Sequence, residues 1–371
     1  MDTEDVLGLQ EDEVETALAD FFTIDGLTAR QLMPWPMDVF REPAPWRQYD
    51  HLSIQDKLES MPALTKEART LIEMNYTANS GTDAANTAFT GALRWYALGG
   101  YTFAGTTAVG GTYKIGNGGM TSLANAISQE LSCDRSFGAE VTAIIQDKKG
   151  VTVQTRDGHT LAAGHVVCTI PLYELLTVSH LSCCADGVSS RNVLSTIVFE
   201  PPLPTLQRQA IDRGMPHKGG KIICQLDDSC QCDIAGTPCG QSPFMFSMSD
   251  NYDRTGSDLT ALAFTWPDAF SATNGLEDSE TVLLALGTLL EHKSRINAYI
   301  AHDWANDPYA HGAWMSFRPG DMSTYAEALQ HNHGKLMMAS ADWANGFAGF
   351  VDGAIEQGAK AALGIRQALI T

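Results

Sequence analysis

A short apolar run near the C-terminus leads through a polar, glycine-rich turn into a helical segment, and this junction constrains the fold most. Residues 335–342 read Lys-Leu-Met-Met-Ala-Ser-Ala-Asp, and the following turn contains Gly346, Gly349 and Gly353. The apolar run predicts a strand, and the Ala-rich segment 354–363 predicts a helix. A strand–turn–helix junction of this kind can aim backbone N–H groups at an anionic or carbonyl-bearing ligand.

Length and charge set the broad class of the protein. The 371 residues favour about two domains, and 44% hydrophobic content is enough for a substantial core. The net charge of −20 argues against nucleic acid and anionic membranes as partners. The longest apolar runs, such as 281–286, are far shorter than the roughly 20 residues of a spanning helix. Because the acidic N-terminus also lacks the features of a secretory signal, we expect a soluble, cytoplasmic protein.

The eight cysteines raise the question of a disulfide framework or a metal site. In a chain of this length without a signal, free thiols are the expected state. Cys224, Cys230, Cys232 and Cys239 form a cluster, but their spacings of six, two and seven residues lack the paired C-x-x-C knuckles of structural zinc sites. We therefore expect no metal.

The order of predicted elements changes near residue 140. Before it, the segments 11–22, 53–58 and 65–76 have the pattern of helices. After it, the apolar segments 141–145, 151–155 and 165–170 are separated by Lys-Gly and Asp-Gly turn signals. These three segments predict a three-stranded meander.

The C-terminal junction closely resembles the FAD motif of the flavin-containing amine oxidases, the monoamine oxidase family. That motif reads A-G-T-E, five residues to an aromatic, then G-Y-M-E-G-A and a helix. This chain has Ala-Ser-Ala-Asp at 339–342, Phe347, and Gly-Phe-Val-Asp-Gly-Ala at 349–354. Phe-Glu-Pro-Pro-Leu-Pro at 199–204 also matches a family segment. The alternative for the junction alone is a structural strand-to-helix connection.

The resemblance implies an α/β (α+β) fold, in which the FAD-binding part of the amine oxidase fold, truncated at its N-terminus, joins a mixed-sheet substrate domain with helices. The implied parts are a helical part of the substrate domain (1–110), the remaining FAD-binding part with the meander (111–177), an atypical insertion (178–197), the substrate-domain sheet (198–310) and a C-terminal FAD-binding segment (311–371).

Two features depart from the family. The family begins with a G-x-G-x-x-G turn that receives the FAD pyrophosphate, and this sequence contains no such turn. Its absence predicts FAD binding weakened by orders of magnitude, because the backbone donors to the pyrophosphate are lost. The polar insertion at 178–197 is either a surface loop or an unspliced intron.

By resemblance, three residues form the catalytic site. Trp314 and Phe350 would be the two aromatic walls that hold the amine, and Lys221 would bind a water molecule at flavin N5. Lys218 is a weaker candidate for the lysine. The alternatives are ordinary core packing for the aromatics and a solvated lysine at the start of a strand.

The resemblance also implies the cofactor contacts. Val141 would hold the adenine through its main chain, Asp342 would lie beside the ribityl and phosphate groups, and Val351 would donate its N–H to the flavin carbonyl edge, with Gly349 at a matching motif position. For Asp342 a helix N-cap is an alternative that can coexist. Because Ala313 stands where covalent flavoenzymes of the family have cysteine, FAD is expected to be non-covalent.

The implied activity is FAD-dependent oxidation of an amine to an imine, with hydride transfer to flavin and reoxidation by oxygen that gives hydrogen peroxide. The expected partners are a small-molecule amine and oxygen, with no nucleic acid and no membrane; a homo-oligomer is compatible with the sequence. Two alternatives stay open. One is a flavin-dependent tailoring oxidase or desaturase of a non-amine metabolite, and the other is a cofactor-free remnant without activity.

Overall fold

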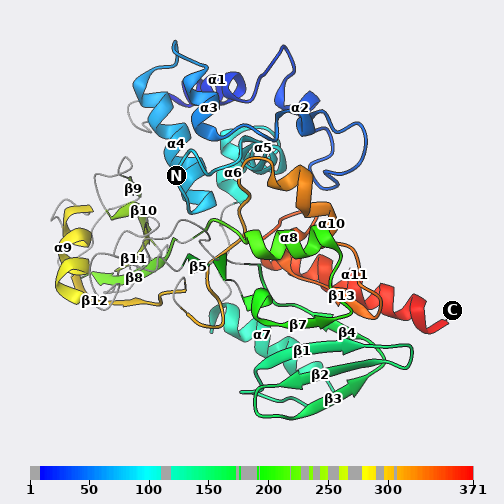
Figure 1. Cartoon of the computed structure of the whole chain (residues 1–371). Helices are drawn as coiled ribbons and strands as arrows, with labels where there is room; N and C mark the ends of the chain where they lie inside the picture. The colour runs from blue at the N-terminus through cyan, green and yellow to red at the C-terminus, as the bar shows by residue number, and fades with distance from the viewer. Residues whose placement is uncertain are drawn as a thin grey trace, which may run out of the picture.

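The computed structural model describes most of the chain, which Figure 1 colours in order along the sequence. The described residues are 9–109, 118–172, 175–176, 190–191, 193–217, 219–226, 234–236, 243–249, 259–265, 278–289, 296–304 and 307–370. Most of the predicted insertion at 178–197 lies outside these residues, as do Lys218, Cys230, Cys232 and Cys239.

The N-terminal region is a block of helices around an aromatic core. Its first helix buries Val14 and Leu18 and leaves Asp12 exposed, as the amphipathic pattern predicted. Phe22 at its end stacks on Tyr96, with 4.6 Å between the ring centroids. The elements are α1 (Glu11–Phe21), α2 (Ala29–Leu32), η1 (Pro45–Tyr49), α3 (Ile54–Glu59), α4 (Lys66–Ser80), α5 (Phe89–Leu98) and α6 (Phe103–Val109).

The meander is present, but its third strand differs from the prediction. β1 (Val141–Gln146), β2 (Val151–Thr155) and β3 (Thr160–Ala163) are antiparallel neighbours, and β7 (Val198–Glu200) adds to β1 in parallel. The prediction that 165–170 is the third strand of the meander is wrong, because the chain already pairs with β2 at residues 160–163, directly after the Asp-Gly turn.

The run at 165–170 belongs to a different sheet. Its central part, β4 (Val166–Cys168), pairs in parallel with β13 (Leu336–Met338). After β13 the chain passes through η5 (Ala341–Trp343) into α11 (Val351–Ile370), so the predicted C-terminal strand–turn–helix junction is confirmed. The three β13 residues are buried, which explains their continuous apolar sequence.

A separate five-stranded antiparallel sheet lies to one side, with α9 (Ser279–Leu289) against it (Figure 1). Its order is β12 (Ile296–Ala301), β8 (Lys221–Leu226), β11 (Leu259–Thr265), β10 (Phe244–Ser249) and β9 (Ile234–Gly236). In β8, Ile222 and Cys224 are buried while Ile223 is exposed, as strand alternation requires.

Shorter elements connect these parts. The side-chain amide of Gln207 donates to the carbonyls of Ala328 (3.0 Å) and His331 (2.6 Å), which ties α8 to α10 and the turn after it. The connecting elements are α7 (Gly119–Glu130), β5 (Leu175–Leu176), β6 (Ser190–Arg191), η2 (Val193–Thr196), α8 (Thr205–Arg213), the π-helix η4 (Met322–Ala326) and α10 (Glu327–Leu329). Helices combined with antiparallel strand pairs and two parallel pairs, β1–β7 and β13–β4, are the α/β (α+β) class that the sequence predicted.

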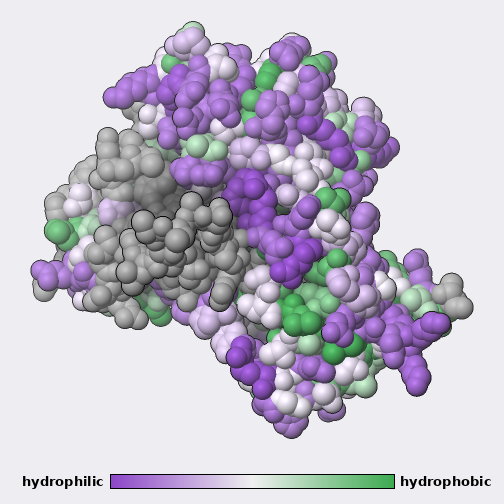
Figure 2. All heavy atoms as spheres, in the orientation of Figure 1, coloured by the Kyte–Doolittle hydropathy of each residue, from purple (hydrophilic) through white to green (hydrophobic). Residues whose placement is uncertain are grey.

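The molecular surface is polar over the N-terminal helices, whereas apolar side chains gather near β7 and β4 (Figure 2). Val198 and Val167 are among the exposed apolar residues there. In the described part of the chain, no helix combines the length and the hydropathy needed to cross a membrane.

Candidate functional site

The turn between η5 and α11 is held from two sides by charged groups. The buried Arg94 of α5 donates from Nη2 to the carbonyl oxygens of Ala344 (2.6 Å), Asn345 (2.6 Å) and Gly346 (2.9 Å). The Glu356 carboxylate of α11 accepts from the N–H groups of Asn345 (2.8 Å) and Gly346 (2.9 Å). Burial lowers the pKa of Arg94 to about 10, against the effect of Glu356, which raises it. The guanidinium therefore stays charged at neutral pH and fixes the turn.

The start of α11 presents backbone donors next to this turn. Helix geometry leaves the N–H groups of Val351, Asp352 and Gly353 without an intrahelical acceptor, and the first bond of the helix runs from Ala354 N to Phe350 O (3.0 Å). Such a helix N-terminus favours carbonyl oxygens and partial negative charge.

Glycine is required at two points of this turn. Gly349 has φ +81°, and a Cβ placed there would lie 3.4 Å from Met315. A Cβ on Gly353 would lie 2.5 Å from the carbonyl oxygen of Phe347. The motif glycines thus allow the backbone to pack closely where the helix begins, and Gly349 brings the segment of Phe350 against the segment of Trp314.

Lys221 and Trp314, predicted separately, come together. Lys221 is the first residue of β8, and its Nζ lies 4.9 Å from the centroid of the Trp314 ring. The indole Nε1 of Trp314 donates to the carbonyl of Asn79 at 2.7 Å, which fixes the ring plane. The Lys221 side chain keeps accessible surface but is closely surrounded by protein, and this desolvation lowers its pKa. Because residues with perturbed pKa values cluster at functional sites, Lys221 is a candidate for a functional group.

A histidine that the sequence did not single out completes this cluster. His217 is fully buried, and its ring centroid lies 3.9 Å from that of Trp314. The ring packs on Gly81, the left-handed residue that ends α4, so closely that a Cβ there would lie 1.9 Å from His217 Nε2. Burial lowers the pKa of His217 to about 3; a hydrogen bond with its own backbone opposes this shift, and the nearby Lys221 charge adds to it. The imidazole is therefore neutral at physiological pH.

We expect His217 to make the protein sensitive to acid. Its pKa is 6.5 in the unfolded chain and about 3 in the folded one, so the unfolded state binds more protons between these values and stability falls as the pH falls through this window. From pH 6 to pH 4, wild type should lose about 2 kcal/mol more free energy of unfolding than His217→Phe. Urea denaturation of both proteins at each pH measures this difference, and equal losses would contradict it.

Phe350 stacks on a partner that the sequence did not indicate. Its ring is parallel to that of Trp95 on α5, with centroids 5.3 Å apart and an interplanar angle of 8°. It also meets Phe347 edge-on at 6.3 Å, and 46% of its surface is exposed. Phe350 and Trp314 therefore contact different aromatic side chains. That the two rings form the walls of one slot stays a prediction. The largely apolar sequence of α5 could have marked Trp95 as a core residue.

Asp342 and Val141 lie at strand ends. The buried Asp342 accepts a hydrogen bond through Oδ2 from the N–H of Leu172 (2.8 Å), which links the exits of β13 and β4. The N-cap of η5 is Ser340, whose hydroxyl accepts from Asp342 N (3.3 Å), so the alternative that Asp342 is the cap is wrong. Val141 is the half-buried first residue of β1. Their roles in cofactor binding stay predictions.

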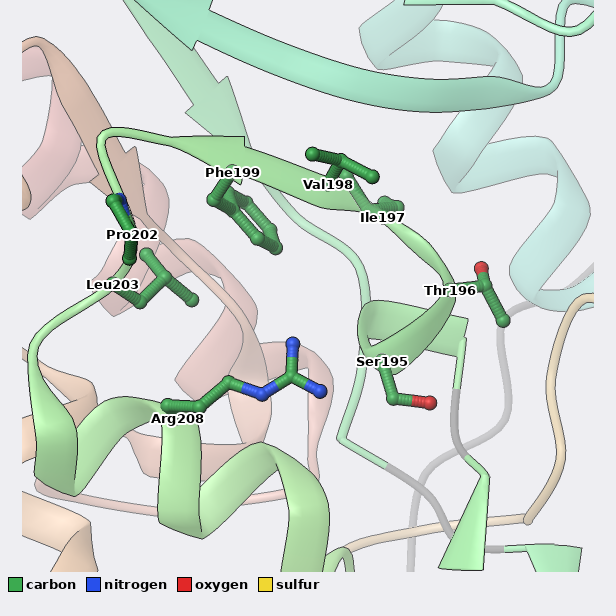
Figure 3. Close-up of a pocket in the computed structure, with 8 residues that line it drawn as sticks. All are labelled: Ser195, Thr196, Ile197, Val198, Phe199, Pro202, Leu203 and Arg208. Atoms are coloured by element: carbon green, nitrogen blue, oxygen red, sulfur yellow. The ribbon is translucent and has the colours of Figure 1, made fainter.

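A cavity of about 280 Å³ lies elsewhere, between η2, β7 and α8 (Figure 3). The Arg208 side chain reaches toward it from α8, but its guanidinium is paired with Asp212 at 2.6 Å. Its described lining includes none of the predicted site residues, and it is Ser195, Thr196, Ile197, Val198, Phe199, Pro202, Leu203 and Arg208. We therefore place the candidate site at Lys221, Trp314 and the start of α11.

The chain is similar to several known proteins over most of its length. The profile described as "Flavin containing amine oxidoreductase" matches residues 8–365. A pseudooxynicotine dehydrogenase from Pseudomonas sp is 27% identical over 365 residues, covering 96% of this chain and 68% of the relative. A nicotine dehydrogenase from Pseudomonas putida is 26% identical over 343 residues, covering 92% and 65%. The chain thus spans about two thirds of the length of these relatives.

Solved structures show the same fold. Wild-type putrescine oxidase bound to putrescine superposes with a TM-score of 0.73 at 19% identity, covering 98% of this chain and 77% of that one. Cyclohexylamine oxidase from Brevibacterium oxydans superposes with a TM-score of 0.67 at 17% identity, covering 97% and 74%. At these identities the likeness concerns the fold alone.

Proposed function

This chain belongs to the family of flavin-containing amine oxidoreductases, and we propose on that premise that it oxidises a small amine to an imine with FAD as the hydride acceptor. The observation that carries the proposal is the placement of Lys221 Nζ 4.9 Å from the Trp314 ring centroid. The two residues are far apart in sequence, and the family resemblance predicted each of them as part of one amine site.

The described residues fit the flavin ring of FAD. The N–H groups at the start of α11, which have no intrahelical acceptor, suit the flavin carbonyl edge, and the close packing at Gly349 and Gly353 keeps side chains away from this helix end. Val351 would hold the ring edge through its main chain, and Phe350 would lie next to it. When bound, FAD supplies the hydride acceptor, and oxygen reoxidises it with release of hydrogen peroxide.

The protein's own residues would select the neutral amine. A substrate ammonium placed beside Trp314 would meet the Lys221 charge and a desolvated environment, both of which disfavour a second cation. The amine would therefore lose its proton before it settles against the indole face. Trp314, fixed by its bond to Asn79, would then orient the amine carbon.

We expect peroxide release only with amine substrates. The chain, supplied with excess FAD, is assayed with a panel of primary, secondary and tertiary amines, and with alcohols and hydrocarbons that share their carbon skeletons. Amine-dependent peroxide supports the proposal. Product formation from the amine-free compounds alone would indicate a tailoring oxidase or desaturase, and no turnover of any compound by FAD-loaded protein would indicate a remnant.

A further inference from the structure

Three aromatic rings meet where α5 approaches the start of α11. The ring of Trp95, on α5, lies parallel to that of Phe350, with an interplanar angle of 8° and 5.3 Å between the centroids. Phe347 meets Trp95 and Phe350 edge-on, at 6.4 Å and 6.3 Å. Offset-stacked and edge-on contacts are the two arrangements that aromatic rings prefer. The neighbours of Phe350 therefore set the plane of its ring before any ligand binds.

Trp95 is held more firmly than Phe350. It is half-buried and packs against the main hydrophobic core, and the preceding residue, Arg94, binds the carbonyls of the turn before α11. Helix α5 thus holds both the backbone of the turn and the ring at its end. Phe350, in contrast, has 46% of its surface exposed, and its ring contacts within the described residues are those with Trp95 and Phe347. The exposed part of this oriented ring is accessible to a ligand.

We propose that Trp95 is a positioning residue that acts through Phe350. It holds the Phe350 ring as a fixed aromatic surface, so that the site prefers amines with an aromatic ring over saturated amines of the same size. This inference rests on the proposed function, in which Phe350 lies next to the flavin. An oriented ring loses little side-chain freedom when an aromatic substrate stacks on it. A saturated ring fills the same space but lacks the quadrupole that favours stacking.

The amines 2-phenylethylamine and 2-cyclohexylethylamine form a matched pair for the test, because they share a carbon skeleton and differ in the aromaticity of the ring. Peroxide release by the full chain with excess FAD gives kcat/KM for each. Wild type should favour the aromatic amine about fivefold, and Trp95→Leu should bring the ratio close to one. The change should lie mainly in KM of the aromatic amine, because stacking acts on binding. Trp95→Phe keeps a ring and should stay within about twofold of the wild-type ratio.

A double-substitution cycle separates positioning from a general structural effect. If Trp95 acts through Phe350, Trp95→Leu should not lower the ratio further in protein that already carries Phe350→Leu. Trp35→Leu is the matched control and should leave the ratio unchanged, because Trp35 packs under Arg41, 4.0 Å from the ring centroid, and has no ring contact with Trp95 or Phe350 among the described residues. Circular dichroism and thermal unfolding establish that each variant is folded.

NMR of the chain with ring-13C-labelled phenylalanine provides a readout that does not depend on turnover. The Phe350 signal, assigned from its loss in Phe350→Leu, should move in Trp95→Leu because the stacked indole no longer shields the ring. The same signal should keep its position in Trp35→Leu.

The outcomes distinguish the two proposals. If FAD-loaded wild type oxidises no amine, the proposed function fails and this inference fails with it. If wild type oxidises both amines but shows no aromatic preference, or Trp95→Leu keeps the wild-type ratio, Trp95 does not set selectivity, while the proposed function stands. A further fall of the ratio in the Phe350→Leu background, or an unmoved Phe350 signal in Trp95→Leu, would overturn the action through Phe350.

Discussion

We expect Arg94→Met to lower the free energy of unfolding by about 3–5 kcal/mol, because it leaves three carbonyls of a largely buried turn and the nearby Glu356 carboxylate without their cation. Arg94 Nη2 bonds the carbonyls of Ala344, Asn345 and Gly346 within 2.9 Å. The same substitution should weaken FAD binding, since this turn positions the start of α11. Urea denaturation measures the first effect, and flavin retention after gel filtration measures the second.

A matched control is Arg47→Met. The half-buried Arg47 reaches Glu327 at 3.5 Å and lies over the rings of Phe40 and Trp46. Methionine keeps this packing, so the loss of the charge should cost less than about 1 kcal/mol. Combining Arg94→Met with Glu356→Gln should cost less than the two single changes together, because both groups hold the same turn. Equal destabilisation by the Arg94 and Arg47 substitutions would contradict the role of Arg94.

Lys221→Met should reduce kcat/KM for the preferred amine by about 100-fold, in the range that a positioned proton-handling side chain contributes. Methionine preserves the length and packing of the side chain but removes the nitrogen over Trp314. FAD should stay bound, because the backbone N–H groups at the start of α11, and not Lys221, would hold the flavin carbonyl edge. Steady-state peroxide assays and the flavin spectrum measure the two effects.

The pH profile provides a second test of Lys221. Burial lowers its pKa below the ordinary 10.5, so the limb of the kcat/KM profile that it causes should lie below that value in wild type and vanish in Lys221→Met. Lys335→Met is the control, because Lys335 Nζ makes an exposed hydrogen bond to the Lys148 carbonyl (2.9 Å) and contacts no predicted site residue in the described part of the chain. Its kcat/KM should stay within about twofold of wild type. A Lys221 variant with wild-type kcat/KM would refute the assignment.

Motif spacing predicted the parts of the site that depend on local sequence. The resemblance to family motifs pointed to Trp314, Lys221 and the glycines at the start of α11. The structure brings Lys221 to Trp314, and their roles in the site stay predictions. The packing partners do not follow from order. His217 stands in an irregular stretch before β8 with no periodicity to mark it, and Trp95 meets Phe350 only through the approach of α5 to α11.

The fold shows the same division between local and long-range information. The helix 11–22 and the first two strands of the meander were predictable, because periodicity and turn residues act within a few positions. The run 165–170 is apolar enough for a strand, but its partner is β13, far along the chain. Arg94 is the single basic residue of the apolar helix α5. This isolated charge could have marked it as a residue with a buried partner, but periodicity alone does not detect it.

Anaerobic titration of the FAD-loaded chain with amine, followed by visible absorbance, tests the central claim most directly. The account predicts that a primary or secondary amine removes the oxidised flavin band and that air restores it with release of peroxide. Bound FAD whose spectrum no amine changes would contradict the claim that this chain is an amine oxidase.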